Sequence, residues 1–202
     1  MMKFPTYNFL IIGLLLLAGC KSSQDLANIP SKSKNGNFQA VIEIPAGTNK
    51  KIEYHKTKKK FLVDQREGKD RIIDFLPYPG NYGFIPSTFS DPEQGGDGDA
   101  VDVLILGESK NTGSIIGIIP IAVFKLIDEG ELDYKIIAIP ADLKAQIIKT
   151  ENYQGFTSNY PEVIKILESW FSFYDKSQVI EIDGWGNETE AIEEIEKWLK
   201  KP

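Results

Sequence analysis

The chain has almost no cysteine or histidine: its 202 residues include one Cys and one His. A single thiol, Cys20, leaves no partner for a disulfide within the chain, and a lone histidine provides no His cluster for a transition metal. Positive charge is also scarce, because 23 Lys and Arg residues face 29 Asp and Glu residues, for a net charge of −6. A protein that binds a phosphate backbone needs a basic face, so nucleic acid is not expected as a partner.

The chain also lacks an apolar run long enough to cross a membrane, which takes about 20 residues. Its longest such run, residues 9–18, follows Lys3 and has the length of the apolar part of a secretory signal. The sequence Leu-Ala-Gly-Cys, which ends at Cys20, resembles the bacterial lipobox and implies cleavage before Cys20 and diacylation of its thiol. We therefore expect residues 1–19 to be a lipoprotein signal peptide. An ordinary signal peptide or a short buried helix is the alternative.

Under this interpretation the mature protein is exported and lipid-anchored to a bacterial membrane, facing the periplasm or the cell surface. Residues 20–37 comprise the lipidated Cys20 and a stretch rich in Ser, Lys and Asn with little to bury, which predicts a flexible tether. Residues 38–202 are long enough to form one domain with a sizeable core.

Short apolar or alternating runs bounded by turn residues fill most of this domain, and two helical patterns follow late in the chain. The first helix is expected after Pro161, and the second near the C-terminus, with Asn187 or Thr189 as its N-cap. Many short strands with late helices favour an α+β domain with an antiparallel or barrel-like sheet. The expected strands are 38–45, 51–55, 61–65, 100–106, 115–127, 134–140 and 178–185.

Three carboxylates crowd one short segment, in which Asp97, Asp99 and Asp102 occur within six residues and no basic residue lies among them. Such charges repel, so the segment is either a solvated loop or the binding site of a cation that is not part of the chain. Relief of this repulsion predicts that the metal-free protein without Asp102 or Asp133 is no less stable. An EF-hand loop is not expected, because Asp102 occupies the position where that loop needs Gly.

Other charged residues lie on strand faces that are otherwise apolar. Asp128 opens the turn of a predicted hairpin, and Asp133 and Lys135 are two residues apart, so they share one face of the returning strand. Lys51 and Glu53 share a face in the same way. Each pair is either part of a site or an ordinary solvated ion pair.

These segments together resemble the family I soluble inorganic pyrophosphatases. The acidic segment has that family's D-x-D-x-x-D pattern before an apolar strand, and further resemblance lies in PYPGNYGFIP, DEGELDYK and IEIPAG. The resemblance covers roughly residues 38–185. It implies an OB-like five-stranded antiparallel β-barrel with flanking helices, in a homo-oligomer. It also implies hydrolysis of inorganic diphosphate to two phosphates by metal-activated water, with several Mg²⁺ ions per site, or Mn²⁺ or another divalent ion in their place.

The resemblance also implies roles for individual residues. Asp99 matches the general base and Tyr82 a catalytic tyrosine, while Glu53 matches an outer acid behind Lys51. The implied metal ligands are Asp97, Asp102, Asp128, Asp133 and Glu43, and the implied phosphate-binding residues are Lys51, Arg71, Lys135, Tyr174 and Lys176.

Two departures from the family pattern affect the phosphate-binding residues. An insertion follows the FLVD strand, so that either Arg71 or Arg66 could supply the family's arginine. Arg71 is favoured because it keeps the Asp-Arg-apolar order. The family's Tyr-Lys pair reads Tyr174-Asp175-Lys176, which displaces the lysine by one residue.

Two alternative functions remain: a lapsed enzyme that only binds metal or phosphate, and a hydrolase of a related phosphoanhydride. Retention of the metal carboxylates argues against the first of these.

Overall fold

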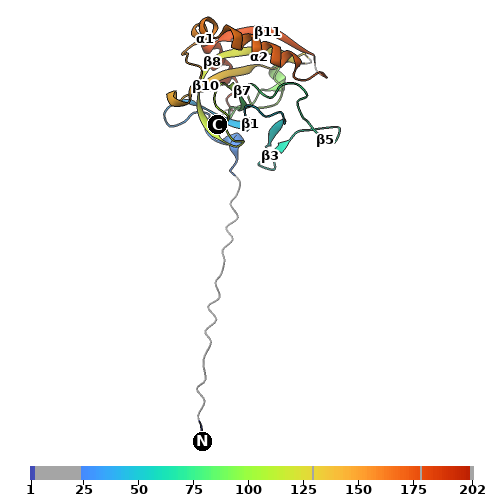
Figure 1. The fold of residues 1–202 in the computed structure, drawn as a ribbon, viewed down its shortest axis with the longest axis vertical. Coiled ribbons are helices and arrows are strands. Elements are labelled where there is room, and N and C mark those ends of the chain that lie inside the picture. The colour runs from blue at the N-terminus through green and yellow to red at the C-terminus, as the bar shows by residue number, and fades with distance from the viewer. Residues whose placement is uncertain (3–23, 129, 178, 201–202) are drawn as a thin grey trace.

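The computed structural model describes residues 1–2, 24–128, 130–177 and 179–200 (Figure 1). Cys20 and most of the predicted signal peptide lie outside the described residues. Among the described residues, no helix is both long and apolar enough to cross a membrane. The elements are η1 (Leu26–Asn28), β1 (Phe38–Ile44), β2 (Ile52–His55), β3 (Lys60–Val63), β4 (Gln65–Arg66), β5 (Lys69–Asp70), β6 (Asn81–Phe84), η2 (Pro92–Gln94), β7 (Asp102–Ile105), β8 (Ile115–Asp128), β9 (Glu131–Leu132), β10 (Lys135–Pro140), η3 (Leu143–Ala145), α1 (Tyr153–Asn159), α2 (Pro161–Phe173), β11 (Ile180–Asn187) and α3 (Glu188–Lys197).

Five strands form a ring-like network within an α+β fold. They pair in the order β1, β6, β7, β10 and β8, and β8 pairs with β1 to complete the ring. The prediction of an entirely antiparallel sheet is wrong at one place, because β7 and β10 run parallel. The chain returns from β7 along β8, which lies on the far side of β10 and antiparallel to it, so β10 regains the direction of β7. β11 extends the network from β8.

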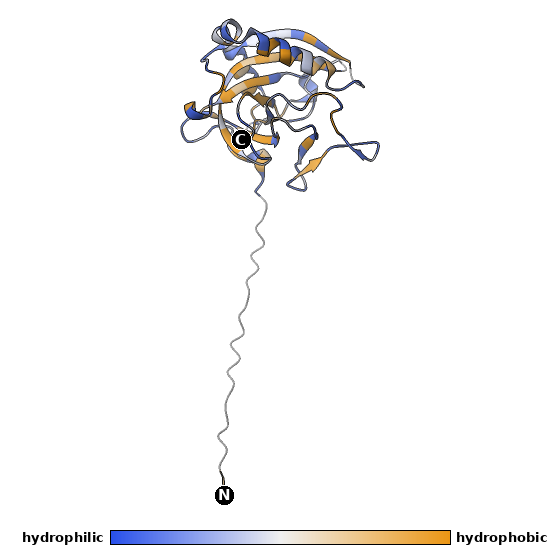
Figure 2. Cartoon of the chain, in the orientation of Figure 1, coloured by the Kyte–Doolittle hydropathy of each residue, from blue (hydrophilic) through white to orange (hydrophobic). Residues whose placement is uncertain are grey.

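The strands carry two apolar faces, because successive side chains point to opposite sides. Along β10, Ile137 and Ile139 belong to one buried cluster with Trp170 and Phe171 of α2. The alternate residues Ile136 and Ala138 belong to a second cluster, with Ile195 of α3. Figure 2 shows β8 and β10 as largely apolar strands, with the more polar α1 and α2 on one side of them. Each face of the sheet is therefore covered, and the charged residues are left for the strand ends.

The helix starts follow the expected chemistry. α2 begins at Pro161, where the missing N–H costs no helical hydrogen bond. α3 has Asn187 as its N-cap, whose side chain accepts from the backbone N–H groups of Thr189 and Glu190, while the Glu190 side chain accepts from the Asn187 backbone. The prediction of Asn187 as a cap is confirmed.

The structure differs from the predicted tether from residue 24 onward. Ala27 and Ile29 are buried in a cluster with Tyr54 and Phe84. The Leu26 backbone N–H donates to the Tyr54 hydroxyl at 3.1 Å, and the Ala27 carbonyl accepts from the backbone of residue 87 at 2.9 Å. Val41 of β1 and Phe84 of β6 belong to the same buried cluster, so a few apolar residues are enough to hold this segment against the strands. Residues 24–37 are thus a docked strap on the domain.

Gly83 in β6 is required by close approach of β1. A Cβ built on this glycine would lie 1.9 Å from the Val41 carbonyl oxygen. We expect Gly83→Ala to lower the free energy of unfolding by about 3 kcal/mol, because the backbones of two paired strands must separate. Urea denaturation measures the change. Gly117→Ala is the matched control, since its Cβ would meet nothing closer than 3.4 Å, and an equal loss in the control would contradict the explanation.

Candidate active site

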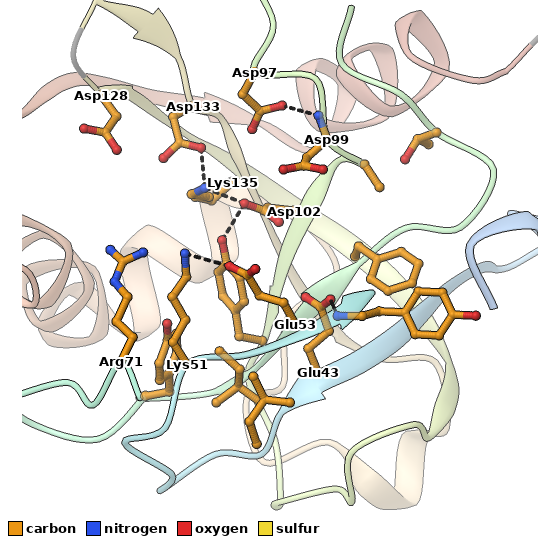
Figure 3. A pocket seen from close by; sticks show the side chains of 18 of the residues that line it. Glu43, Lys51, Glu53, Arg71, Asp97, Asp99, Asp102, Asp128, Asp133 and Lys135 are labelled. Carbon is orange, nitrogen blue, oxygen red and sulfur yellow. Dashed lines mark hydrogen bonds and ion pairs between the residues drawn. The ribbon is translucent and has the colours of Figure 1, made fainter. Parts of the chain in front are cut away.

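A cavity of about 460 Å³ lies where the starts of β7 and β10 meet the β8–β9 turn, β2 and β6. The parallel pairing of β7 and β10 sets Asp102 directly beside Lys135, so the two predicted site segments arrive at one edge of the sheet. Figure 3 shows the labelled aspartates on one side of this cavity and Lys51 and Arg71 extending toward them from the other, where Glu43 and Glu53 also lie. The predicted residues that line it are Glu43, Lys51, Glu53, Arg71, Tyr82, Asp97, Asp99, Asp102, Asp128, Asp133, Lys135 and Tyr174.

Lys135 supplies a positive charge within the acidic cluster. The sequence placed it on one strand face with Asp133 but did not indicate its contact with Asp102. Its ammonium group donates to Asp102 Oδ2 at 2.5 Å and also to Asp133 Oδ1. Its side chain is only 7% exposed, so these bonds lie in a poorly solvated place. Burial alone lowers the pKa of Lys135, but Asp102 and Asp133 more than offset this, and the pKa lies well above its usual range. The ammonium group therefore stays charged.

Asp102 is the centre of this network. Besides Lys135, the Tyr82 hydroxyl donates to Asp102 Oδ2 at 2.5 Å. Burial and the nearby Asp102 carboxylate raise the pKa of Tyr82 well above its usual range, so Tyr82 remains a donor. These contacts argue against the expectation that loss of Asp102 or Asp133 leaves the metal-free protein no less stable, because either change takes an acceptor from a buried ammonium group. We now expect both changes to lower its stability.

The loop before β7 sets Asp97 and Asp99 at the mouth of the cavity. The Asp99 backbone N–H donates to Asp97 Oδ1 at 2.9 Å. Loss of hydration raises the pKa of Asp97 to about 6, and the nearby Asp102 carboxylate adds to this rise. The hydrogen bond from the Asp99 backbone lowers the pKa and only partly offsets the increase. Asp99 is 73% exposed and pairs with Lys56 at 2.8 Å. Asp99 is thus open to solvent at the mouth of the cavity.

Glu43 lies deeper than the other carboxylates. It is 9% exposed and accepts from the Tyr54 backbone N–H at 2.6 Å. Burial raises the pKa of Glu43 to about 8, and the backbone hydrogen bond opposes that rise. A carboxyl group in this position gains most from a nearby cation, which stabilises its charged form.

The cationic side of the cavity holds Lys51, Arg71 and Tyr174. Lys51 pairs with Glu53 at 2.9 Å, as their shared strand face predicts. Tyr174 stacks on Trp170 with ring centroids 4.7 Å apart, and burial raises the pKa of Tyr174 to about 12, so its hydroxyl is a donor. Lys176 is exposed and is not among the described residues that line the cavity.

The positions of Arg71 and Arg66 decide which of them could bind phosphate in the cavity. Arg71 lines the cavity, whereas Arg66 does not. Both guanidinium groups instead meet at Asp175, which sequence reasoning did not select: Arg71 Nη2 is 2.5 Å and Arg66 Nη2 is 2.9 Å from its Oδ2. The only sequence signal was the acidic residue inserted between Tyr174 and Lys176.

Asp175 is expected to stabilise the fold above its unfolded-state pKa. Burial raises its pKa, but hydrogen bonds from Arg66, Ser177 and Arg71 outweigh this, and the pKa lies below the usual range. A lowered pKa contributes stability that is present near neutral pH and is lost as pH falls. We expect Asp175→Asn to lower the free energy of unfolding by about 2 kcal/mol at pH 7. Urea denaturation at pH 7 and pH 3 should show this difference shrinking at the lower pH, and an equal difference at both would contradict it.

The donor set of the cavity fits hard divalent cations. Carboxylates outnumber Lys and Arg side chains among the described residues that line it, and oxygen donors are what Mg²⁺-like ions prefer. In the described part of the chain, no group of three or more His, Cys, Asp or Glu side chains is arranged closely enough to hold a metal ion. Two of the carboxylates, Asp102 and Asp133, are instead bridged by the ammonium group of Lys135.

Comparison with known proteins identifies the family to which the chain belongs. A family model described as inorganic pyrophosphatase matches residues 40–201. An inorganic pyrophosphatase of Neisseria meningitidis serogroup B is 34% identical over 181 residues, which cover 85% of this chain and 94% of that protein. The crystal structure of an inorganic pyrophosphatase from Neisseria gonorrhoeae is 30% identical, with a TM-score of 0.70 and coverage of 87% and 96%.

A third comparison concerns the fold alone. The inorganic pyrophosphatase structure from Thermus thermophilus has a TM-score of 0.74 at 23% identity, over 87% of this chain and 97% of that one. The fold and the matched family thus define a phosphoanhydride hydrolase, of a family that uses divalent metal cofactors. The chain belongs to the family I inorganic pyrophosphatases, and it hydrolyses inorganic diphosphate.

Proposed function

We propose that the chain is a Mg²⁺-dependent inorganic diphosphatase that acts outside the cytoplasm from a lipid anchor. The proposal of diphosphatase activity rests on one observation. Five carboxylates that the family resemblance implies as metal ligands and four side chains that it implies as phosphate-binding residues line one cavity. The ring of strands, in this proposal, is the OB-like barrel of the family, and the working form is a homo-oligomer.

The proposed metal ligands lie on the acidic side of the cavity. Asp97, Asp102 and Asp133 would hold the tightly bound ions, Asp128 would contribute to an ion that arrives with substrate, and Glu43 would serve a further site. Bound Mg²⁺ would neutralise the charge of diphosphate and activate the attacking water.

The remaining residues bind the substrate and accept the proton. Lys51, Arg71, Lys135 and Tyr174 present N–H and O–H donors to the phosphate oxygens, which draws charge away as the leaving phosphate departs. Asp99, exposed at the mouth, accepts the proton of the attacking water as general base. Tyr82 holds the Asp102 carboxylate in place through its hydroxyl.

Phosphate release from diphosphate, triphosphate and ATP tests this function directly. We expect rapid release from diphosphate in Mg²⁺ and little from the other two. The matched control is Asp74→Asn, which changes an exposed carboxylate outside the cavity and should leave the rate unchanged. Release from none of the three would point to a lapsed enzyme, and a preference for triphosphate or ATP would point to a hydrolase of a related phosphoanhydride.

The anchor has its own test at Cys20, a position outside the described residues. In cells that process bacterial lipoproteins, we expect Cys20→Ser to remain active but to move from the membrane fraction to the soluble fraction, or to stay unprocessed. Loss of the acylated thiol removes the apolar chains that hold the protein to lipid. Ser22→Ala is the control and should stay with membranes. Tight partition of the Cys20→Ser protein into membranes would contradict the lipobox interpretation.

A further inference from the structure

Asp175 lies where two arginines from the same inserted region converge. Arg71 Nη2 donates to Asp175 Oδ2 at 2.5 Å. Arg66 donates from Nη2 to the same oxygen at 2.9 Å and from Nη1 to Asp175 Oδ1 at 3.2 Å. The Asp175 side chain is 9% exposed and that of Arg71 13%, whereas that of Arg66 is 43% exposed. The Asp175–Arg71 contact is therefore the shielded one, and the Arg66 contact covers its outer side.

The Arg71 guanidinium group donates hydrogen bonds to carboxylates from two different parts of the fold. Its Nη1 donates to Asp64 Oδ2 at 3.2 Å, just before the β4–β5 hairpin, while Asp175 approaches from the end of α2. Its backbone is held as well, because the carbonyl of Arg71 accepts from the Lys51 backbone N–H at 3.0 Å. A planar guanidinium group held by two carboxylates has a fixed orientation, which a single pair does not provide.

We propose that Asp175 is a positioning residue for substrate binding, which holds Arg71 in the orientation that receives diphosphate, and that Arg66 holds Asp175 in turn. The inference rests on the proposed function of Arg71. It explains why an acidic residue is compatible with a position next to a side chain that binds a polyanion. The charge of Asp175 is directed at two guanidinium groups and is neutralised by them, so it orients a cation and adds little repulsion toward substrate.

Arg66 completes the arrangement from the hairpin. Besides Asp175, its Nη1 lies 2.5 Å from the Ser177 hydroxyl, and that hydroxyl and the Ser177 backbone N–H both bond Asp175 Oδ1, at 2.6 and 3.0 Å. Asp175 is thus held by groups on both sides of its carboxylate. The inserted β4–β5 hairpin is joined by this contact to the segment after α2, and through it to the cavity.

The test is a double-mutant cycle on the Michaelis constant for diphosphate at saturating Mg²⁺, well below the melting temperature of each variant. Arg71→Ala is expected to raise KM by about 30-fold, because it removes a charge-assisted hydrogen-bond donor. Asp175→Asn should raise KM by about 10-fold with kcat changed less than about 2-fold, because the donor remains but is no longer oriented. In the Arg71→Ala background, Asp175→Asn should add nothing, since there is no guanidinium left to position.

Two further variants guard against a purely structural effect. Asp175→Glu restores the charge and should bring KM part of the way back. Arg66→Gln, at a more exposed position, is expected to raise KM by about 3-fold in the wild type and to add nothing to Asp175→Asn. Asp183→Asn, at an exposed residue of β11 outside the cavity, is the matched control and should keep the wild-type KM.

The outcomes distinguish the positioning role of Asp175 from the substrate-binding role of Arg71. If Arg71→Ala raises KM but Asp175→Asn does not, or if their effects multiply independently, the positioning role of Asp175 is overturned while the function of Arg71 stands. If Arg71→Ala leaves KM unchanged, the proposed function of Arg71 is overturned, and the inference fails with it. Non-additive effects on KM with rescue by Glu support it.

Discussion

Asp102→Ala is expected to reduce diphosphate hydrolysis by about 10³-fold or more, even in excess Mg²⁺. Asp102 is the one carboxylate of the cluster that both Lys135 and Tyr82 contact, each at 2.5 Å. Its removal therefore takes away a proposed metal ligand and also the acceptor that orients two neighbouring donors. Phosphate release under saturating diphosphate, followed across a Mg²⁺ titration, measures the loss.

The same variant is expected to be less stable than the wild type without metal. Lys135 keeps only Asp133 as a carboxylate partner, and the Tyr82 hydroxyl loses its acceptor, which together cost about 3 kcal/mol of the free energy of unfolding. Urea denaturation in a chelator measures this, with Asp74→Asn as the control for loss of a carboxylate outside the cavity. Near wild-type activity in excess Mg²⁺ would refute the metal role of Asp102, and unchanged stability would refute the role of Lys135 as its counter-ion.

Asp99→Asn is expected to lower kcat by about 10²–10⁴-fold while leaving KM and Mg²⁺ affinity nearly unchanged. Asp99 stands apart from the Lys135 network, with its side chain 73% exposed and paired with Lys56. Replacement by an amide keeps the shape of the side chain and removes its ability to accept a proton. The rate should recover in part as pH rises, because hydroxide then becomes available without the base.

Asp97→Asn is the matched comparison, since it alters the neighbouring carboxylate of the same loop. Because Asp97 is a proposed metal ligand, the defect of Asp97→Asn should differ from that of Asp99→Asn. The amide should weaken Mg²⁺ binding, and added Mg²⁺ should restore part of the rate. The decisive measurement is a Mg²⁺ titration of kcat for both variants at two pH values. Restoration of Asp99→Asn by excess Mg²⁺ would make Asp99 a ligand and leave the base to be found elsewhere.

Sequence patterns predicted the strands that have strong apolar periodicity and the two longer helices. β6 was missed, because Asn81–Phe84 lies in a segment rich in Pro and Gly that is typical of a loop. Gly83 is there for contact with β1, a reason that only the paired strand reveals. α1 was also missed, since its seven residues include Gly155 and give too short a pattern to detect. Local periodicity likewise does not indicate which strand pairs with which, so the parallel β7–β10 pair could not be foreseen.

The site was predicted better than the contacts within it. Residue types and the family resemblance selected side chains that line the cavity, with the exception of Lys176, because their chemistry is visible along the chain. They did not reveal that Lys135 lies between Asp102 and Asp133, which depends on the register of β10 against β7. They also gave no role to Asp175, whose partners Arg66 and Arg71 are more than 100 positions away, with separations of 109 and 104 residues.

The docked strap limits how far the enzyme could stand from a lipid surface. If Cys20 carries the proposed anchor, only three residues lie between it and Gln24, and the four steps along the backbone reach about 14 Å when fully extended. Ala27 of the strap also lines the cavity, so catalysis would take place close to the headgroups. An anionic headgroup layer repels diphosphate over a Debye length of about 8 Å at physiological ionic strength. The ionic strength around the cell, and not the protein alone, would then govern how readily substrate reaches the enzyme.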